Sequence, residues 1–249
     1  TVHYAVLGAA SVRVATAEGS DVPARVVALD FHSGIAVLVA DAVRVPGLPL
    51  APLASVARGA DVFLLAATGD GGRRVSDGTV MAVDPFVANW EFALDAAIAT
   101  SARNPGLGGA PLVDCQGRVL GLSFVDLGEV GRFVLAIPSD VFADHRAELL
   151  ARGRRVSRPP RAWVGFFCQG RRDHVVVAGV LPDAPAARAG LQAGDVVVAV
   201  DGERVPDQES LYAALWAQPP GTERALRVLR GDATVDLRVP TTEAEAFFA

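Results

Sequence analysis

The chain has 249 residues, of which 51% are hydrophobic and 20% are charged, and its formal net charge is −5. This length suffices for one large domain or two ordinary ones, and the composition is typical of proteins with well-developed cores. The negative charge argues against a nucleic-acid partner, which would favour a basic face. No apolar run approaches the roughly 20 residues of a membrane helix, so we expect no membrane span.

Cysteine and histidine usage indicates no metal centre. Cys115 and Cys168 have neither a CxxC spacing nor a nearby histidine, so we expect two free thiols. The histidines are scattered along the chain without the spacing of metal ligands: His3, His32, His145 and His174. We therefore expect no metal site and no cofactor.

The first part of the chain has the pattern of short strands separated by Gly, Asp and Ser turns, which is typical of a barrel or a sandwich. The expected strands are residues 12–14, 24–29, 35–39, 62–67, 78–83, 112–113, 119–122 and 133–137. A single helix is expected over Ser139–Leu150, because apolar residues there recur three and four apart. Pro159 and Pro160 then mark a linker. The first part is therefore an all-β domain closed by a helix.

The second part mixes strands with two short helices over about eighty residues, which is the size of a compact independent domain. The expected strands are residues 163–167, 175–180, 196–200, 225–230 and 235–239, and the expected helices are residues 185–189 and 208–217. Residues 243–249 are expected to form a frayed tail.

One motif in the second part is long and specific. Ala184–Gly202 reads APAARAGLQAGDVVVAVDG and resembles the PAAxAGLxxGDxIxxVxG core of the PDZ domains of bacterial HtrA proteases. A PDZ domain binds an extended peptide by adding it to a sheet edge, with backbone amides holding the terminal carboxylate. The resemblance places this carboxylate loop on Trp163, Val164, Gly165 and Phe166.

Two further expectations follow for this groove. Gly165 should be small because the ligand carboxylate must approach the backbone closely. The second wall should be the helix over 208–217, with Leu211 and Leu215 four residues apart on one face. For these two leucines, lining of the pocket and ordinary core packing both remain open.

The first part carries a second resemblance. Asn104–Asp114 reads NPGLGGAPLVD and resembles the NPGNSGGPLV nucleophile loop of HtrA/DegP-type serine proteases. In that family the serine attacks the substrate and the turn before it supplies the oxyanion hole. Gly108 stands at the serine position, and a glycine has no oxygen with which to attack a carbonyl. Leu107 and Ala110 also depart from the pattern and put the geometry of the oxyanion hole in doubt.

Two upstream segments extend this resemblance. Ala24–Leu38 resembles the AKVVGxDxxxDIAVL segment of the family and has Gly34 where an aspartate orients the catalytic histidine. Thr1–Ala9 resembles TAAHVVxGA and has Tyr4 at the histidine position, although a slip of one residue would put His3 there instead. The catalytic positions Tyr4, Gly34 and Gly108 are thus degenerate.

Nearby hydroxyl groups do not offer a replacement for the nucleophile. The candidates are Ser33, Ser101 and Ser123. Their positions favour turn and strand-end roles, so we expect no substitute triad.

The resemblance implies a mainly β fold: a trypsin-like double β-barrel followed by a PDZ domain. Roughly two strands that precede the histidine in the family are missing before Thr1, so we expect either that the chain is a fragment or that the first barrel is incomplete. The implied domains are a protease-like domain at 1–150, a linker at 151–160, a PDZ domain at 161–242 and a tail at 243–249.

The sequence therefore predicts a catalytically inactive HtrA-like protein that binds peptides and unfolded or C-terminal protein segments. It would act as an adaptor, scaffold or chaperone in protein quality control. The alternative is an active HtrA-like serine endopeptidase with non-standard catalytic residues. The resemblance implies a bacterial periplasmic or cell-envelope location and leaves a homo-oligomer open.

Overall fold

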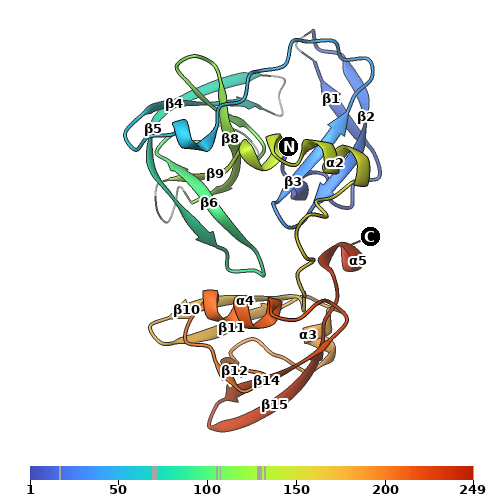
Figure 1. The fold of residues 1–249 in the computed structure, drawn as a ribbon, viewed down its shortest axis with the longest axis vertical. Coiled ribbons are helices and arrows are strands. Elements are labelled where there is room, and N and C mark those ends of the chain that lie inside the picture. The colour runs from blue at the N-terminus through green and yellow to red at the C-terminus, as the bar shows by residue number, and fades with distance from the viewer. Residues whose placement is uncertain are drawn as a thin grey trace. The chain divides into compact units, whose positions relative to one another are not determined.

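The computed structural model describes residues 1–16, 18–68, 72–104, 106, 108–127, 131 and 133–248. The chain separates into two compact units, one made of Thr1–Phe86 and Leu94–Ser157, the other of Val87–Ala93 and Arg158–Ala249 (Figure 1). The short segment Val87–Ala93 therefore belongs with the second unit, although both of its neighbours in sequence belong to the first. The domain limits expected from the sequence do not anticipate that this segment packs with the second unit.

The first unit begins with a three-stranded antiparallel sheet in the order β1-β2-β3. Its elements are the short 3-10 helix η1 (His3–Ala5), β1 (Val12–Ala15), β2 (Asp21–Asp30) and β3 (Ile35–Val39). In the turn from β2 to β3, the carboxylate of Asp30 accepts hydrogen bonds from the backbone N–H of Ser33, at 3.1 Å, and from its hydroxyl. Both side chains are buried, so this pair fixes the turn that carries Gly34.

The rest of the first unit is a closed barrel in the order β4-β5-β6-β9-β8-β7. Its strands are β4 (Asp61–Ala67), β5 (Arg73–Val87), β6 (Ala93–Thr100), β7 (Pro111–Asp114), β8 (Val119–Asp126) and β9 (Val134–Pro138), and η2 (Leu53–Ser55) precedes β4. Alternate residues of β4 point into the barrel, as expected for a strand with one buried face. The core contains the fully buried side chains of Val62, Leu64, Ile98, Leu112 and Ala136.

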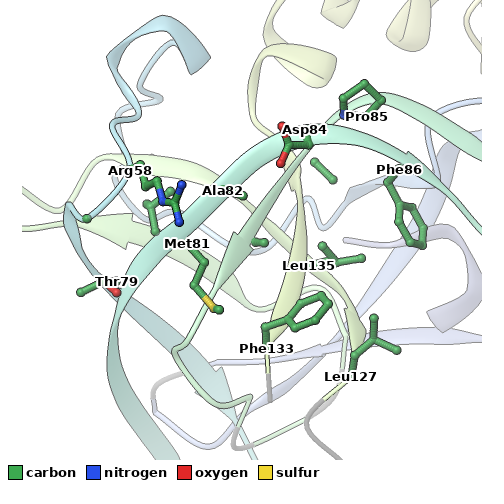
Figure 2. A pocket seen from close by; sticks show the side chains of 14 residues that line it. Arg58, Thr79, Met81, Ala82, Asp84, Pro85, Phe86, Leu127, Phe133 and Leu135 are labelled. Atoms are coloured by element: carbon green, nitrogen blue, oxygen red, sulfur yellow. The ribbon is translucent and has the colours of Figure 1, made fainter. Parts of the chain in front are cut away.

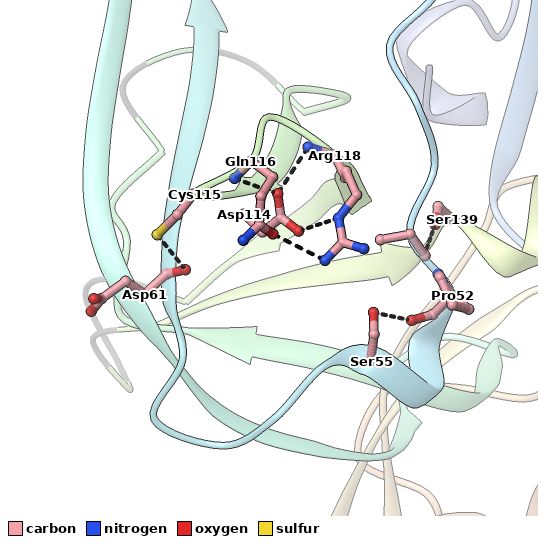
Figure 3. Close-up of polar contacts among 9 residues, drawn as sticks. Pro52, Ser55, Asp61, Asp114, Cys115, Gln116, Arg118 and Ser139 are labelled. Carbon is pink, nitrogen blue, oxygen red and sulfur yellow. Dashed lines mark hydrogen bonds and ion pairs between the residues drawn. The ribbon is translucent and has the colours of Figure 1, made fainter.

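The turn between β7 and β8 is held by its own side chains (Figure 3). Oδ1 of Asp114 accepts from the backbone N–H groups of Gln116 and Arg118, both at 2.9 Å. Oδ2 accepts from Nε of Arg118 at 2.7 Å. Cys115 lies in the same turn as an exposed free thiol, and Cys168 of the second unit is a buried free thiol. The expectation of two free cysteines is confirmed.

The helical region after β9 differs from the single expected helix. It forms two short helices, α1 (Asp140–Ala143) and α2 (Arg146–Arg152). The first turn is tied to the segment before β4, because both carboxylate oxygens of Asp140 accept from the Leu53 N–H, at 3.0 and 2.9 Å. At the start of α2, Nδ1 of His145 lies 2.8 Å from a carboxylate oxygen of Glu148. These side-chain contacts fix the two turns separately, which periodicity alone does not reveal.

The second unit is a mixed domain of strands and short helices. Its elements are β10 (Phe166–Arg171), β11 (His174–Val180), α3 (Pro185–Arg188), β12 (Val196–Val200), β13 (Glu203–Arg204), α4 (Gln208–Trp216), β14 (Glu223–Arg230), β15 (Ala233–Pro240) and α5 (Ala244–Phe248). The sheet has the order β10-β11-β12-β14-β15, and β13 pairs with β12. Strand β10 is therefore an edge strand, and an edge can accept a further strand.

The turn before β12 is held by a buried carboxylate. Asp195 accepts the backbone N–H of Gln192 at 2.9 Å and a paired contact from the guanidinium of Arg230 at 2.8 and 2.7 Å. Asp195 is only 1% exposed, and the Arg230 hydrogen bonds help to keep the pKa of its carboxyl below the usual range against the opposing effect of burial. The role of Asp195 is structural.

The chain end is ordered rather than frayed. The Trp163 and Thr242 backbones exchange hydrogen bonds at 2.7 and 2.9 Å. In α5, the rings of Phe247 and Phe248 lie 4.7 and 5.6 Å from the ring of Trp163. The expected frayed tail is wrong for residues 244–248, because these aromatic contacts hold a helix that the sequence pattern was too short to indicate. Within the described residues, no helix is long and apolar enough to cross a membrane.

Candidate functional site

The position expected for the nucleophile is filled by a neighbouring side chain. A Cβ atom built on Gly108 would overlap the hydroxyl of Tyr4 and lie 2.8 Å from its Cζ. That hydroxyl donates to the backbone carbonyl of Phe124 at 2.6 Å. Partial burial raises the pKa of Tyr4, so the hydroxyl keeps its proton and stays a donor. The structure thus brings Tyr4 and Gly108 together, and Tyr4 fills the space that a serine side chain would need.

The position expected for the orienting acid also lies at this site. Gly34 adopts a left-handed backbone with φ 79°, and its carbonyl oxygen accepts the backbone N–H of His3 at 2.8 Å. Nδ1 of His3 lies 3.1 Å from the same oxygen. Burial lowers the pKa of His3, which favours the neutral ring, although the carbonyl contact opposes this. The partner that Gly34 offers to this ring is a backbone carbonyl.

One of the oxyanion donors expected in the loop before Gly108 is engaged by a side chain of the loop itself. In the Ser-His-Asp template, the donors are the N–H groups of the nucleophile and of the residue two places before it, which correspond to Gly108 and Gly106. The N–H of Gly106 donates to Oδ1 of Asn104 at 3.1 Å. Asn104 therefore occupies one expected donor. The departure at Leu107 lies outside the described residues.

The candidate replacement hydroxyls are all engaged elsewhere. Ser33 donates to Asp30, as described above. Oγ of Ser123 accepts the N–H of Ala110 at 3.0 Å, and Oγ of Ser101 accepts the N–H of Thr79 at 3.0 Å. None of these described contacts is to a histidine, so the chemistry of an activated serine has no support here.

A cavity of about 680 Å³ lies in the first unit beside β5 and β9 (Figure 2). Apolar side chains such as Met81, Phe133 and Leu135 line it, with the charged groups of Arg58 and Asp84 at one side. The described lining contains no serine, histidine or cysteine, so we assign it no catalytic role. The described part of the chain also has no cluster of His, Cys, Asp and Glu side chains able to hold a metal.

The second unit contains a site that holds a carboxylate through backbone donors. Oε1 of Glu91 accepts the N–H of Val164 at 2.8 Å, and Oε2 accepts those of Gly165 and Phe166 at 2.7 and 3.3 Å. These are residues of the expected carboxylate loop, and the group they hold belongs to the segment Val87–Ala93. We call the loop Trp163–Phe166, the edge of β10 and the start of α4 the edge site.

The same segment lies along β10 as an added strand. Trp90 pairs with Phe167 in an antiparallel bridge, and the N–H of Cys168 donates to the carbonyl of Asn89 at 2.7 Å. The start of α4 contacts it from the other side. Gln208 donates to the Ala88 carbonyl at 3.2 Å, and the Tyr212 hydroxyl donates to the same carbonyl at 3.0 Å.

The expected groove residues fall into two groups. Val164, Phe166, Leu211 and Leu215 are at most 2% exposed and belong to the core of the second unit. The ring of Trp163 packs on Phe247 and Phe248 of α5. Gly165 has φ 86°, and a Cβ built on it would overlap Cβ of Ala184, so packing within the unit requires this glycine in addition to the close carboxylate.

Sequence reasoning missed Glu91, Gln208 and Tyr212. An acid in a connection between two strands carries no motif, and the two residues of α4 read as ordinary members of a short helix. Burial raises the pKa of Glu91 to about 7, although its three backbone hydrogen bonds act in the opposite direction. The upward shift is a consequence of burying a carboxylate without a cation beside it.

Comparison with known proteins identifies both units. Residues 1–122 match the trypsin-like peptidase domain family, and residues 119–241 match the PDZ domain family. The chain is 30% identical over 251 residues to a probable periplasmic serine endoprotease DegP-like from Halomonas elongata, covering 91% of this chain and 50% of that protein. It is 28% identical over 258 residues to a protein of the same description from Pseudomonas fulva, covering 96% of this chain and 52% of that one. The chain spans about half the length of these curated relatives.

A solved structure agrees with these matches. The HtrA-type protease AlgW with decapeptide has a TM-score of 0.58 and 25% identity, covering 98% of this chain and 78% of that chain. The mainly β fold predicted from the sequence, a trypsin-like domain followed by a PDZ domain, is confirmed. The chain belongs to the HtrA/DegP-type family of trypsin-like serine proteases with a PDZ domain.

Proposed function

We propose that this chain is a catalytically inactive member of its family, which works by holding peptides and unfolded or C-terminal protein segments. It would serve as an adaptor, scaffold or chaperone in protein quality control. The observation that carries the loss of catalysis is the contact at Gly108. The nucleophile position has no side chain, and the hydroxyl of Tyr4 fills the space where one would stand.

The edge site supports peptide binding. Its three N–H groups converge on one carboxylate, which is the group that a PDZ domain recognises at the end of a peptide. A solved relative is described as an HtrA-type protease with decapeptide. Because the binding atoms are backbone donors, peptide binding does not depend on the catalytic side chains that are missing.

The remaining parts of the proposal rest on the relatives. Two of them are named periplasmic, which supports a periplasmic or cell-envelope location, and the proposal leaves room for a homo-oligomer. We also propose functional domains at 1–150 and 161–242, joined by residues 151–160 and followed by residues 243–249.

The loss of catalysis is tested with a serine-directed fluorophosphonate probe and with casein as substrate. The native chain should show neither labelling nor cleavage, while trypsin in the same reactions shows both. Labelling at a single serine, located by mass spectrometry and abolished by its replacement with alanine, would establish an active endopeptidase with non-standard residues.

Peptide binding is tested by fluorescence anisotropy. A labelled peptide that copies Pro85–Trp90 and ends in a free carboxylate should bind the chain, and the same peptide with an amidated end should bind at least roughly tenfold more weakly, because the charge-assisted bonds are lost. Equal binding of both peptides would contradict recognition of the carboxylate.

A further inference from the structure

The segment Val87–Ala93 is placed with the second unit by its packing, not by its position in the sequence. Residues before it and after it belong to the first unit. The segment runs from the last residue of β5 to the first residue of β6. Val87 packs against the core of the second unit, and Nη1 of Arg161 donates to the carbonyl of Ala93 at 3.1 Å. Both ends of the segment are therefore anchored in the second unit.

Between these ends, the segment makes the contacts of an added strand. It lies antiparallel to β10 through the Trp90–Phe167 bridge and the Cys168–Asn89 hydrogen bond. Its chain runs toward the carboxylate loop, so that Glu91 follows Trp90 and reaches Val164–Phe166. This is the direction in which a peptide end must point if its last carboxylate is to meet that loop.

The Glu91 carboxylate is the least expected member of the contact. Among the described residues it has no salt-bridge partner, and its acceptors are matched to three backbone N–H groups. Desolvation of a carboxylate without a cation is unfavourable unless hydrogen bonds compensate. A connection that merely crossed the surface would gain nothing from placing the Glu91 carboxylate on these backbone N–H groups. A ligand of a carboxylate site requires a carboxylate at this place.

The start of α4 completes the contact. Gln208 reaches both the Ala88 carbonyl and Oδ1 of Asn89, each at 3.2 Å, and Tyr212 reaches the Ala88 carbonyl. The segment is therefore held on both walls of the edge site.

We propose that Val87–Ala93 is an internal ligand of the edge site, in which the Glu91 side chain takes the place of a peptide's terminal carboxylate. This inference rests on the proposed peptide binding of the edge site and adds its regulation. An external ligand binds by displacing the segment, so its apparent affinity is reduced by the fraction of molecules in which the edge site is occupied. Because the segment is tethered at both ends, it competes at a high effective concentration.

The proposal also extends the class of ligand. The internal ligand is acidic and continues beyond its carboxylate, since Phe92 and Ala93 follow Glu91 in the chain. The edge site therefore accepts a glutamate side chain inside a continuous strand, in addition to a free chain end. Displacement by either kind of ligand releases the connection between β5 and β6.

The test uses the full chain and the variants Glu91→Gln and Glu91→Ala. Glu91→Gln keeps the shape and removes the charge, and Glu91→Ala removes the acceptors. Glu203→Gln is the matched control, because Glu203 is an exposed glutamate of β13 in the same unit. Circular dichroism establishes that each variant is folded.

The first readout needs no external ligand. Amide hydrogen exchange at Val164, Gly165 and Phe166 should be slow in the native chain and in Glu203→Gln. It should be roughly tenfold faster or more in Glu91→Ala, because the opened state is then favoured, with a smaller change in Glu91→Gln. Unchanged exchange in both Glu91 variants would overturn the internal ligand.

The second readout is binding of a labelled, amidated peptide that copies Pro85–Phe92, whose only carboxylate is the glutamate side chain. It should bind Glu91→Ala at least roughly tenfold more tightly than the native chain, with a smaller gain for Glu91→Gln, while a peptide with alanine at that place binds none of them tightly. Equal affinity for native and variant chains would also overturn the internal ligand. If exchange changes as expected but neither this peptide nor a carboxylate-ended one binds, the internal ligand stands and the proposed peptide-binding function fails.

Discussion

The catalytic position of the first unit and the edge site of the second are both filled by the chain itself, but in different ways. At Gly108, one side chain, Tyr4, occupies the space of a missing nucleophile. At the edge site, a whole segment is held by hydrogen bonds, and every donor that a ligand would use is still present. Tyr4 can be removed from the space at Gly108 only by changing a residue. In our proposal, the segment at the edge site is displaced by a stronger ligand.

The contrast follows from the kind of atom that each function uses. Covalent catalysis requires particular side-chain atoms, so the replacement of one serine by glycine is sufficient to remove it. Strand addition uses backbone N–H and C=O groups, which remain when side chains change. A family member can therefore lose its chemistry and keep its binding surface.

The largest expected effect concerns the frame of the edge site. Leu211 is fully buried in the core of the second unit, so Leu211→Ala should lower the free energy of unfolding by about 2–5 kcal/mol through lost burial and a cavity. Urea denaturation followed by tryptophan fluorescence measures this. Leu229→Ala, at a side chain that is 40% exposed, should cost less than about 1 kcal/mol. Normal stability with altered peptide affinity in Leu211→Ala would make this residue part of a pocket instead of the core.

The next effect separates backbone strain from packing at the carboxylate loop. Gly165 and Gly190 both have φ 86°, but a Cβ on Gly165 would overlap Ala184, whereas nothing lies within 4 Å of one on Gly190. Gly190→Ala should cost about 1 kcal/mol from the left-handed backbone alone, and Gly165→Ala about 2–4 kcal/mol because overpacking is added. Thermal unfolding of the two variants compares them directly. Equal losses would show that the loop can relax, and the edge site would then be less rigid than its contacts indicate.

Much of this arrangement could be predicted from the sequence. Alternating apolar residues gave the strands, and the Ala184–Gly202 motif gave the PDZ domain, because strand faces and tight turns leave local patterns. The same comparison placed Tyr4 and Gly108 at catalytic positions, and the structure brings them into contact.

The occupant of the edge site could not be predicted in this way. Glu91 meets its partners across 73 to 75 positions of sequence, and no local pattern encodes such a contact. The split of the expected helix at Asp144 and the helix α5 were missed for a related reason, since contacts with distant side chains fix both. Local patterns indicate which helices and strands form. They do not indicate which segment of the chain occupies a binding site formed by another segment.

A smaller change in stability is expected at Gly108, where Tyr4 fills the space of the expected nucleophile. A Cβ on Gly108 overlaps the Tyr4 hydroxyl, so Gly108→Ala should cost about 1–2 kcal/mol of stability. The value lies near the low end because the ring of Tyr4 is 46% exposed and can shift. In a Tyr4→Ala background the same change should cost less than about 0.5 kcal/mol, and the difference is the coupling energy of the pair. Additive effects of the two substitutions would show that Tyr4 does not fill this position. Only the edge site would then be filled by the chain itself.

The smallest expected effect is a pH dependence that only the edge site should show. The pKa of Glu91 is about 7 when the segment is bound, above the value near 4.3 of a free glutamate. The bound segment therefore holds more protons between these values, so its contact is strongest below about pH 4.5 and weakens as the pH rises to about 7. External peptide should accordingly bind the native chain more tightly at pH 7 than at pH 5, by at least roughly tenfold, with at most about a further twofold gain above pH 7.

The groups that face Glu91 do not produce this dependence themselves. Burial raises the pKa values of Cys168 and Tyr212, so both stay neutral between pH 5 and pH 7. The carboxylate-ended peptide is ionised throughout, since a free chain end titrates near pH 3.5. Glu91→Gln retains His174, the one histidine of this unit, and should bind the peptide with little change across the range. A pH dependence that persists in Glu91→Gln would assign it to another group, whereas its loss would tie the release of the edge site to the deprotonation of the Glu91 carboxyl group.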